Sequence, residues 1–229
     1  TGILKNNPIH EDMVYAAKTA KLAFIVNVAI DKDKKVIASF AGDVDKAHKV
    51  GCEFVTNLSK IDKVPSDIVV STNGGYPLDQ NIYQAVKGMT AAEATCKDGG
   101  VIIMISACND GHGGQSFYDN VAKASSPSEI LENVRSVEKC ETVPDQWEFQ
   151  ILARILERFT VIMVTDQCSP EMIINMHMKH AKTFEEALNL AFDIKGKDAK
   201  IAVIPDGVSV IVKENTSTDS DSIVSVTAE

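Results

Sequence analysis

The sequence predicts an α/β fold, with a mostly parallel sheet flanked by helices and an antiparallel hairpin near the N-terminus. Short apolar segments alternate with amphipathic ones along most of the 229 residues, an alternation typical of βαβ units. Residues 101–105, Val-Ile-Ile-Met-Ile, form an uninterrupted apolar run, as expected of a parallel strand covered on both faces. Two β-rich runs, 24–30 and 35–40, flank a polar turn at 31–34 and predict the hairpin.

The other elements follow in chain order from periodicity and from residues that start or stop helices. Met13, Ala16, Ala17 and Ala20 recur at helical spacing, and Thr183 stands where a helix N-cap is expected. On this basis helices are predicted over residues 10–20, 44–58, from 80 to the glycines at 99 and 100, 128–137, from 146 onwards and 183–192, and strands over 67–71, 161–164, 201–204 and 208–212.

Length and composition favour one globular domain, or a large domain with a small appendage, over residues 1–213. A chain of 229 residues with 45% hydrophobic residues can bury a sizeable core. Residues 214–229 are rich in Ser, Thr and Asp and predict a flexible tail.

The net charge and the cysteines indicate in which cellular compartment the protein works and which kinds of partner it lacks. The formal net charge of −9 argues against a nucleic-acid-binding surface, which requires clustered Lys and Arg. No apolar run reaches the roughly 18 residues of a membrane span, and no secretory signal is visible. The five cysteines are odd in number and lack a CxxC pair, which indicates neither a disulfide framework nor a zinc site. We therefore expect a cytoplasmic protein with no membrane and no nucleic-acid partner.

The most informative segment for function is 71–88, a glycine-rich turn that leads from an apolar strand into a helix. Gly74 and Gly75 allow close backbone approach to a ligand, and Asp79 is placed to cap a helix that begins near Gln80. This helix is amphipathic. Its apolar face holds Ile82, Ala85, Val86 and Met89, and its polar face holds Gln80, Tyr83, Gln84 and Lys87. The polar face follows a strand, at the sheet edge where open α/β sheets bind ligands.

Gln84 and Lys87 are the candidate ligand-binding groups on this face. An ammonium group offsets part of the desolvation of a small carboxylate through a charge-assisted hydrogen bond. A glutamine amide three residues earlier offers both a donor and an acceptor, which suits a hydroxyl that becomes a carbonyl. The same spacing also describes an ordinary solvated helix face, so the residues alone leave both interpretations open.

Several motifs resemble the carboxyl-terminal domain of the nickel-dependent lactate racemase family. The longest is Asn-Gly-Gly-Tyr-Pro-Leu-Asp-Gln-Asn at 73–81, continued by Tyr-Gln-Ala-Val-Lys-Gly-Met at 83–89. Four shorter motifs resemble the same family, at residues 7–13, 110–114, 144–147 and 204–207. The resemblance spans residues 1 to about 213. It implies that Gln84 and Lys87 contact the substrate, that Tyr83 is adjacent, and that Trp147 lines the pocket.

The resemblance also implies chemistry that this chain does not supply. Family members carry an amino-terminal domain that holds the cofactor, a nickel-pincer nucleotide (pyridinium-3,5-bisthiocarboxylic acid mononucleotide nickel), and provides the histidine acid/bases. None of those motifs occurs here, so we expect the substrate-clamping half of a racemase that interconverts D- and L-lactate, or a similar 2-hydroxy acid, by hydride transfer. The fragment alone is expected to be inactive, with no catalytic residue and no metal ligand of its own, and its partners are the substrate and the amino-terminal domain.

Trp147 and the histidines each have a structural alternative. Trp147 either faces the pocket or anchors the start of a helix that Asp145 caps. His112, between glycines after the strand at 101–105, is either a minor contributor to the site or part of a sharp turn. His177 and His180 lack a third ligand at a convincing separation, which favours a surface or interface pair over a metal site.

Two rival functions remain open from the sequence. The chain could be a non-catalytic module that binds a small carboxylate in the same crevice, or an oligomerisation module whose polar helix only meets solvent. The racemase hypothesis predicts that Lys87 is needed for turnover, whereas the oligomerisation hypothesis predicts that it is not.

Overall fold

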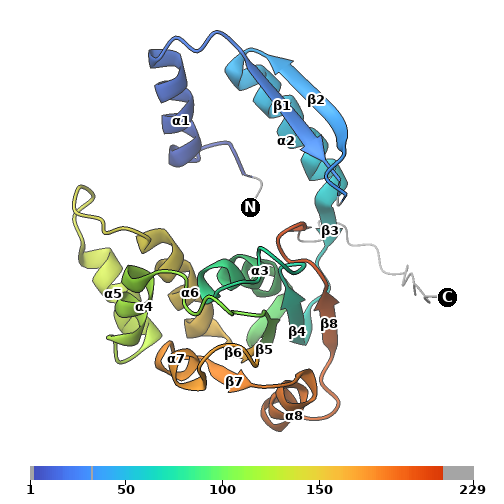
Figure 1. Cartoon of the computed structure of the whole chain (residues 1–229), viewed down its shortest axis with the longest axis vertical. Helices are drawn as coiled ribbons and strands as arrows, with labels where there is room; N and C mark the ends of the chain where they lie inside the picture. Colours follow the sequence, from blue (N-terminus) through green and yellow to red (C-terminus); the bar gives the residue numbers. More distant parts are fainter. Residues whose placement is uncertain (1–2, 32, 214–229) are drawn as a thin grey trace, which may run out of the picture. The chain divides into compact units, whose positions relative to one another are not determined.

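A computed structural model describes residues 3–31 and 33–213 (Figure 1). The chain divides into two compact units. The first comprises the residues up to Ile61 together with Ser209–Ile211, and the second comprises Asp62–Val208 and the residues from Val212 onward. The assignment of residues 1–213 to one part of a longer enzyme stays a prediction. The predicted tail at 214–229 lies outside the described residues.

The first unit contains the predicted hairpin and two helices. Strands β1 (Ile25–Ile30) and β2 (Val36–Gly42) pair antiparallel, which confirms the hairpin. Helix α1 spans Pro8–Thr19, and helix α2 spans Val44–Ser59. Among the described residues of this unit only Ala29 and Ala47 are buried. The unit therefore contains almost no hydrophobic core of its own.

The second unit is built on a five-stranded sheet in the order β7-β6-β5-β4-β8, and every neighbouring pair is parallel. The predicted α/β fold is therefore confirmed. The strands are β4 (Ser66–Thr72), β5 (Cys96–Ile105), β6 (Thr160–Val164), β7 (Lys179–Ala181) and β8 (Ile201–Ile204). A separate pair joins β3 (Lys60–Asp62) to β9 (Ile211–Lys213); β9 therefore begins three residues later than the predicted strand.

Helices cover both faces of this sheet (Figure 1). They are α3 (Ile82–Thr95), α4 (Gln115–Ala122), α5 (Pro127–Ser136), α6 (Gln146–Arg158), α7 (Pro170–Asn175) and α8 (Phe184–Lys195). Ile68 and Val70 pack in a cluster with Ala187 of α8, while Val69 points to the opposite face, where α3 lies. Residues 101–104 of β5 are all fully buried, as their apolar run predicted. No described helix is both long and apolar enough to cross a bilayer.

Two predicted boundaries around α3 are wrong, for reasons that lie outside the helix. Asn81, not Asp79, is the N-cap, and its Oδ1 accepts a hydrogen bond from the Gln84 amide at 3.0 Å. The Asp79 carbonyl is engaged elsewhere, because it accepts from the Cys108 amide and the Ser106 hydroxyl. The helix also ends at Thr95, well before the glycines at 99–100, which belong to β5.

The close approach of α3 to β4 depends on Gly88. A Cβ atom built at this position would collide with Asn73 Oδ1 and would lie 3.1 Å from the carbonyl oxygen of Thr72. The Ser71 hydroxyl donates to the Gly88 carbonyl at 3.0 Å, which ties the same turn of the helix to the strand. A side chain at residue 88 would therefore push the helix away from the sheet.

We expect Gly88→Ala to lower the free energy of unfolding by about 2–3 kcal/mol, because a buried helix and strand must separate to admit the methyl group. Urea denaturation of the chain measures the change. Thr90→Ala, at a partly exposed position of the same helix, is the control and is expected to stay within about 0.5 kcal/mol of the wild type. Equal stability of the two variants would show that the contact at Gly88 relaxes without cost.

Candidate functional site

Two loops at the carboxyl edge of the sheet, one between β4 and α3 and one after β5, hold the first turn of α3. The amides of Ile82 and Tyr83 donate to the carbonyls of Gly111 and His112, in the loop that follows β5, at 3.0 and 3.2 Å. The Asn81 Nδ2 atom donates to Asp110 in the same loop at 3.1 Å. The first amides of the helix are thus satisfied within the protein. The loops position the helix rather than leaving its N-terminus open to an anion.

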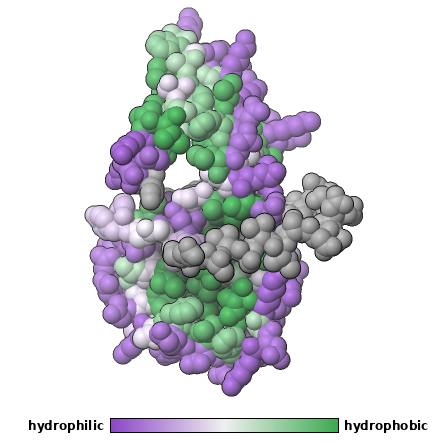
Figure 2. Space-filling view, turned by 90° about the vertical axis from the view of Figure 1, so that its right-hand side faces the viewer, coloured by the Kyte–Doolittle hydropathy of each residue, from purple (hydrophilic) through white to green (hydrophobic). Residues whose placement is uncertain are grey.

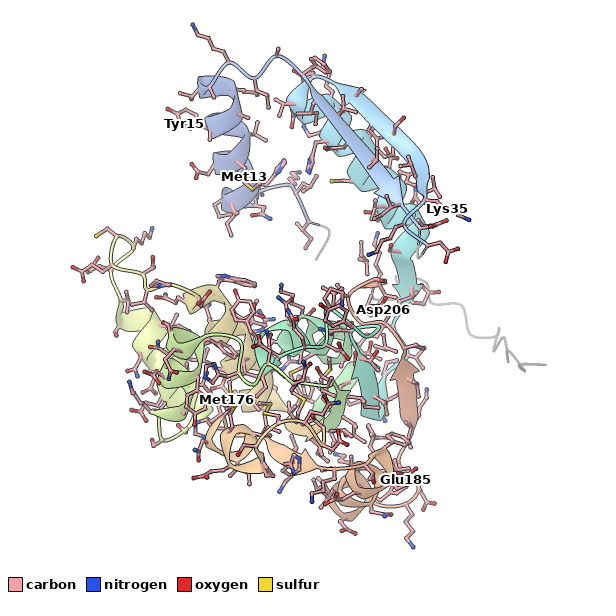
Figure 3. All side chains as sticks on the ribbon, in the orientation of Figure 1. Met13, Tyr15, Lys35, Met176, Glu185 and Asp206 are labelled. Atoms are coloured by element: carbon pink, nitrogen blue, oxygen red, sulfur yellow. The ribbon has the colours of Figure 1, made fainter. Side chains whose placement is uncertain are left out.

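A third loop reaches the same edge from β8. Asn73 forms an antiparallel bridge with Asp206, and the Gly207 amide donates to the Thr72 carbonyl at 2.8 Å. Figure 3 shows Asp206 at the end of β8, on the side of the sheet where α3 begins. Three of the resembling motifs, 73–81, 110–114 and 204–207, therefore meet at one edge.

The structure brings together the three predicted residues of α3. Lys87 Nζ donates to Gln84 Oε1 at 2.8 Å and lies 5.6 Å from the centre of the Tyr83 ring. All three side chains are partly exposed, whereas the opposite face, with Ile82 and Met89, is fully buried. The ammonium group is thus held against a neutral amide, which leaves its positive charge uncompensated by this contact.

Trp147 joins this cluster from helix α6. Its ring meets the Tyr83 ring edge-on, with 6.0 Å between centroids. Because Trp147 is 52% exposed, it is not the core anchor that was one of its two interpretations. Phe117 of α4 also meets the Tyr83 ring edge-on, with 5.4 Å between centroids. The exposed Trp147 thus stands beside Tyr83 on the surface that carries the polar face of α3.

Asp145 acts on Tyr83 instead of capping α6. The helix does begin at Gln146, but the Asp145 side chain makes no capping hydrogen bond, and its backbone has a φ of 63°. Its carboxylate accepts a hydrogen bond from the Tyr83 hydroxyl at 3.2 Å. Burial, followed by this hydrogen bond, raises the pKa of Tyr83 to about 12. Tyr83 is therefore a neutral donor at physiological pH.

Glu148 is the residue of this region that sequence reasoning missed. It is fully buried, and neither carboxylate oxygen has a hydrogen-bond partner among the described residues. Burial raises its pKa to about 7; the nearby ammonium of Lys87 opposes the shift, and Asp145 adds to it. The sequence contained one signal, since Glu148 shares the apolar stripe of α6 with Leu152 and Ile155.

The predicted histidines bind separate backbone groups. His112 accepts from the Gly114 amide at 3.0 Å and stacks on Tyr118, so it shapes the glycine turn. His177 and His180 donate to the carbonyls of Val121 and Thr165. Within residues 3–31 and 33–213, no group of three or more His, Cys, Asp and Glu side chains could hold a metal ion. The donor set described here does not fit a resident nickel ion.

Comparison with known proteins places these observations in a family. Residues 61–212 match the model of the lactate racemase C-terminal domain. The chain is 59% identical over 213 residues to the lactate racemase of Lactiplantibacillus plantarum, covering 93% of this chain and 50% of that protein. It is 56% identical over 214 residues to the lactate racemase of Thermoanaerobacterium thermosaccharolyticum, again covering 50% of the relative.

A solved structure agrees with the sequence comparisons. The structure of the lactate racemase apoprotein from Thermoanaerobacterium thermosaccharolyticum superposes with a TM-score of 0.91, over 93% of this chain and 51% of that one. The chain therefore spans about half the length of the relatives that it matches. The family match covers nearly all of the second unit, which carries the α3 cluster. This chain belongs to the lactate racemase family and contains its carboxyl-terminal domain.

Proposed function

We propose that this chain is the substrate-clamping half of a racemase that interconverts D- and L-lactate or a similar 2-hydroxy acid. The observation that carries the proposal is the Lys87–Gln84 pair, 2.8 Å apart on a partly exposed helix face at the carboxyl edge of a parallel sheet. The names of the relatives support the reaction, and the odd number of free cysteines supports a reducing, cytoplasmic location.

Each side chain of the cluster has its own role in the clamp. The Lys87 ammonium pairs with the substrate carboxylate. Gln84 turns its Nε2 toward the substrate hydroxyl oxygen, because its Oε1 accepts from Lys87. Trp147 covers the bound acid and excludes water, while Asp145 holds Tyr83 in place beside it. These groups bind and orient the substrate, and none is assigned to the chemical step.

The chemical step is assigned to the part of the enzyme that this chain lacks. The described residues do not fit a nickel site, so we propose that the nickel-pincer nucleotide is held by the half of the relatives' length that the chain does not match. When bound, this cofactor supplies a centre that takes a hydride from the α-carbon and returns it to either face. The isolated chain is accordingly proposed to be inactive.

The first unit offers the surface on which that missing half docks. Val26, Val28 and Ile30 alternate along one face of β1 and are 62, 53 and 55% exposed. Helix α1 has no buried residue, and its Met13 and Tyr15 are more than 60% exposed. Figure 2 shows the hydrophobic surface over this unit, and Figure 3 labels Met13 and Tyr15 on α1. A strand with an apolar, uncovered face is expected to be covered in the working protein.

Lys87→Ala in the full-length enzyme is expected to lower kcat/KM for lactate by about 100-fold, the effect of losing one charge-assisted contact worth about 3 kcal/mol. Steady-state racemisation followed by polarimetry measures this. Lys123→Ala, which removes an exposed lysine that follows α4 and pairs with Asp119, is the control and should leave turnover unchanged. Turnover that survives Lys87→Ala would favour the oligomerisation module. Quenching of Trp147 fluorescence by lactate in the full-length enzyme, without racemisation, would favour the non-catalytic binding module.

Val28→Asp is expected to be nearly neutral in this chain alone but to lower the unfolding free energy of the full-length enzyme by about 2–4 kcal/mol, because a buried charge lacks a partner there. Urea denaturation of both lengths measures the difference. Lys35→Asp, in the hairpin turn region, introduces the same side chain at an exposed position and should be tolerated in both. Equal tolerance of Val28→Asp in both lengths, or a dimer of the isolated chain that Val28→Asp dissociates, would contradict docking of the missing half.

A further inference from the structure

Among the described residues, Glu148 is a buried acid of the site region to which the clamp assigns no role. It lies next to Trp147 in the first turn of α6, is fully buried, and has no hydrogen-bond partner for either oxygen among the described residues. An ionised carboxylate in such a place is strongly disfavoured, because it loses water without gaining a donor. A buried acid left unpaired beside a binding surface is therefore a candidate for a functional role.

The charges that act on Glu148 come from the clamp itself. Lys87 of α3 favours its ionised form, and Asp145, just before α6, disfavours it. The other elements in contact with α6 are α4, α5 and β5. Their acids are Asp119, which pairs with Lys123, Glu129, which accepts from Ser125, Asp98, which pairs with Arg158, and the exposed Glu132. Their cations are Lys97, which pairs with Asp67, and the exposed Arg135. The charges that shift the pKa of Glu148 are those of Lys87 and Asp145. The charge state of Glu148 is thus coupled mainly to Lys87.

The Lys87 ammonium can therefore interact with two anions: the carboxylate of Glu148 inside the protein and the carboxylate of a bound substrate. When Glu148 is neutral, the ammonium donates to the neutral oxygen of Gln84, and its positive charge is available to a ligand. When Glu148 is ionised, its charge offsets that of Lys87 through a medium of low dielectric and repels an incoming carboxylate. The two states therefore differ in how strongly the charge of Lys87 can attract an anionic ligand.

We propose that Glu148 is a positioning residue of the substrate clamp: as a neutral acid it leaves the Lys87 ammonium to the substrate carboxylate, and its ionisation withdraws that charge. This inference rests on the proposed function of Lys87. It predicts that the protein binds its substrate more tightly below pH 7 than above it. This dependence is separate from any titration of the groups that perform the chemistry.

The sign of the pH dependence follows from the raised pKa of about 7. Well below pH 7 Glu148 is already protonated, so substrate binding takes up almost no proton. Above pH 7 the substrate must bind against the ionised acid or restore its proton, so affinity falls with increasing pH. The steepest possible dependence is about tenfold in KM per pH unit, reached if only the protonated form binds.

The test is the KM for lactate of the full-length enzyme between pH 5.5 and 8.5. For the wild type we expect KM to rise as the pH passes 7, by up to about tenfold per unit. Glu148→Gln, a neutral amide of the same shape, is expected to remove this rise and keep KM low at pH 8. Glu157→Gln, at an exposed position of the same helix, should show the wild-type profile. The same alkaline rise of KM in Glu148→Gln as in the wild type would overturn the inference.

Two further measurements keep the outcome interpretable. Calorimetric titration of the wild-type enzyme with lactate at pH 7.5, in two buffers of different ionisation enthalpy, should show net proton uptake of up to about one per site; zero uptake overturns the inference without any variant. In thermal unfolding, a buried acid whose pKa rises from 4.5 to about 7 loses stabilisation as the pH increases through this interval. The Tm of Glu148→Gln relative to wild type should therefore increase between pH 4.5 and 7, and a constant difference contradicts burial of the acid.

The failure of this inference can be told apart from failure of the clamp. If Lys87→Ala abolishes turnover while Glu148→Gln keeps the wild-type pH profile, only the role of Glu148 is wrong. If Lys87→Ala leaves KM and turnover unchanged, the clamp itself is wrong, and the inference falls with it.

Discussion

The close contact between α3 and β4 is the constraint on which the site depends. Gly88 lets the helix backbone approach the strand, and Asn73, at the end of that strand, donates from its Nδ2 to the carbonyls of Leu78 and Gln84 at 2.6 Å each. One asparagine thus joins the loop to the first turn of the helix. Because the backbone of Gln84 is held in this way, the side chains of Gln84 and Lys87 emerge at a defined place on the sheet edge.

The electrostatics of the site follow from that placement. A single ammonium, Lys87, stands near two carboxyl groups, Asp145 and Glu148, that differ in environment. Asp145 accepts a hydrogen bond from the Tyr83 hydroxyl, whereas Glu148 is fully buried and neither of its oxygens has a hydrogen-bond partner among the described residues. These two acids are three residues apart in sequence, but Glu148 is fully buried and Asp145 is partly exposed. Burial raises the pKa of Glu148 to about 7, although the Lys87 ammonium opposes this shift.

The two units differ in how much buried apolar surface each has to stabilise it. The second unit has a sheet buried on both faces, with clusters of fully buried aliphatic residues on each side. The first has a hairpin, two helices and two buried alanines among its described residues. A unit with so little buried apolar area gains little from the hydrophobic effect. Its exposed apolar strand face is consistent with a chain that matches only half the length of its relatives.

Local pattern was sufficient for the elements that are long and strongly periodic. The apolar run at 101–105, the hairpin and the amphipathic character of α3 were all visible in the sequence, and the motifs around residues 73–89 were specific enough to indicate the family. Helices α4 and α7, of 8 and 6 residues, and strands β3 and β7, of 3 residues each, were missed, because segments this short display little periodicity.

Contacts distant in sequence decided the rest. Asp79 and Asn81 are both good N-caps by type, and the choice between them was made by Cys108 and Ser106, which bind the Asp79 carbonyl. The packing of α3 against α6 also decides three features of the site: the hydrogen bond from Tyr83 to Asp145, the exposure of Trp147 and the burial of Glu148. The sequence by itself determined the fold class, the family and the polar face of α3, since these are properties of neighbouring residues. The tertiary structure alone decided which acids are solvated and which are buried, because desolvation depends on atoms from other parts of the chain.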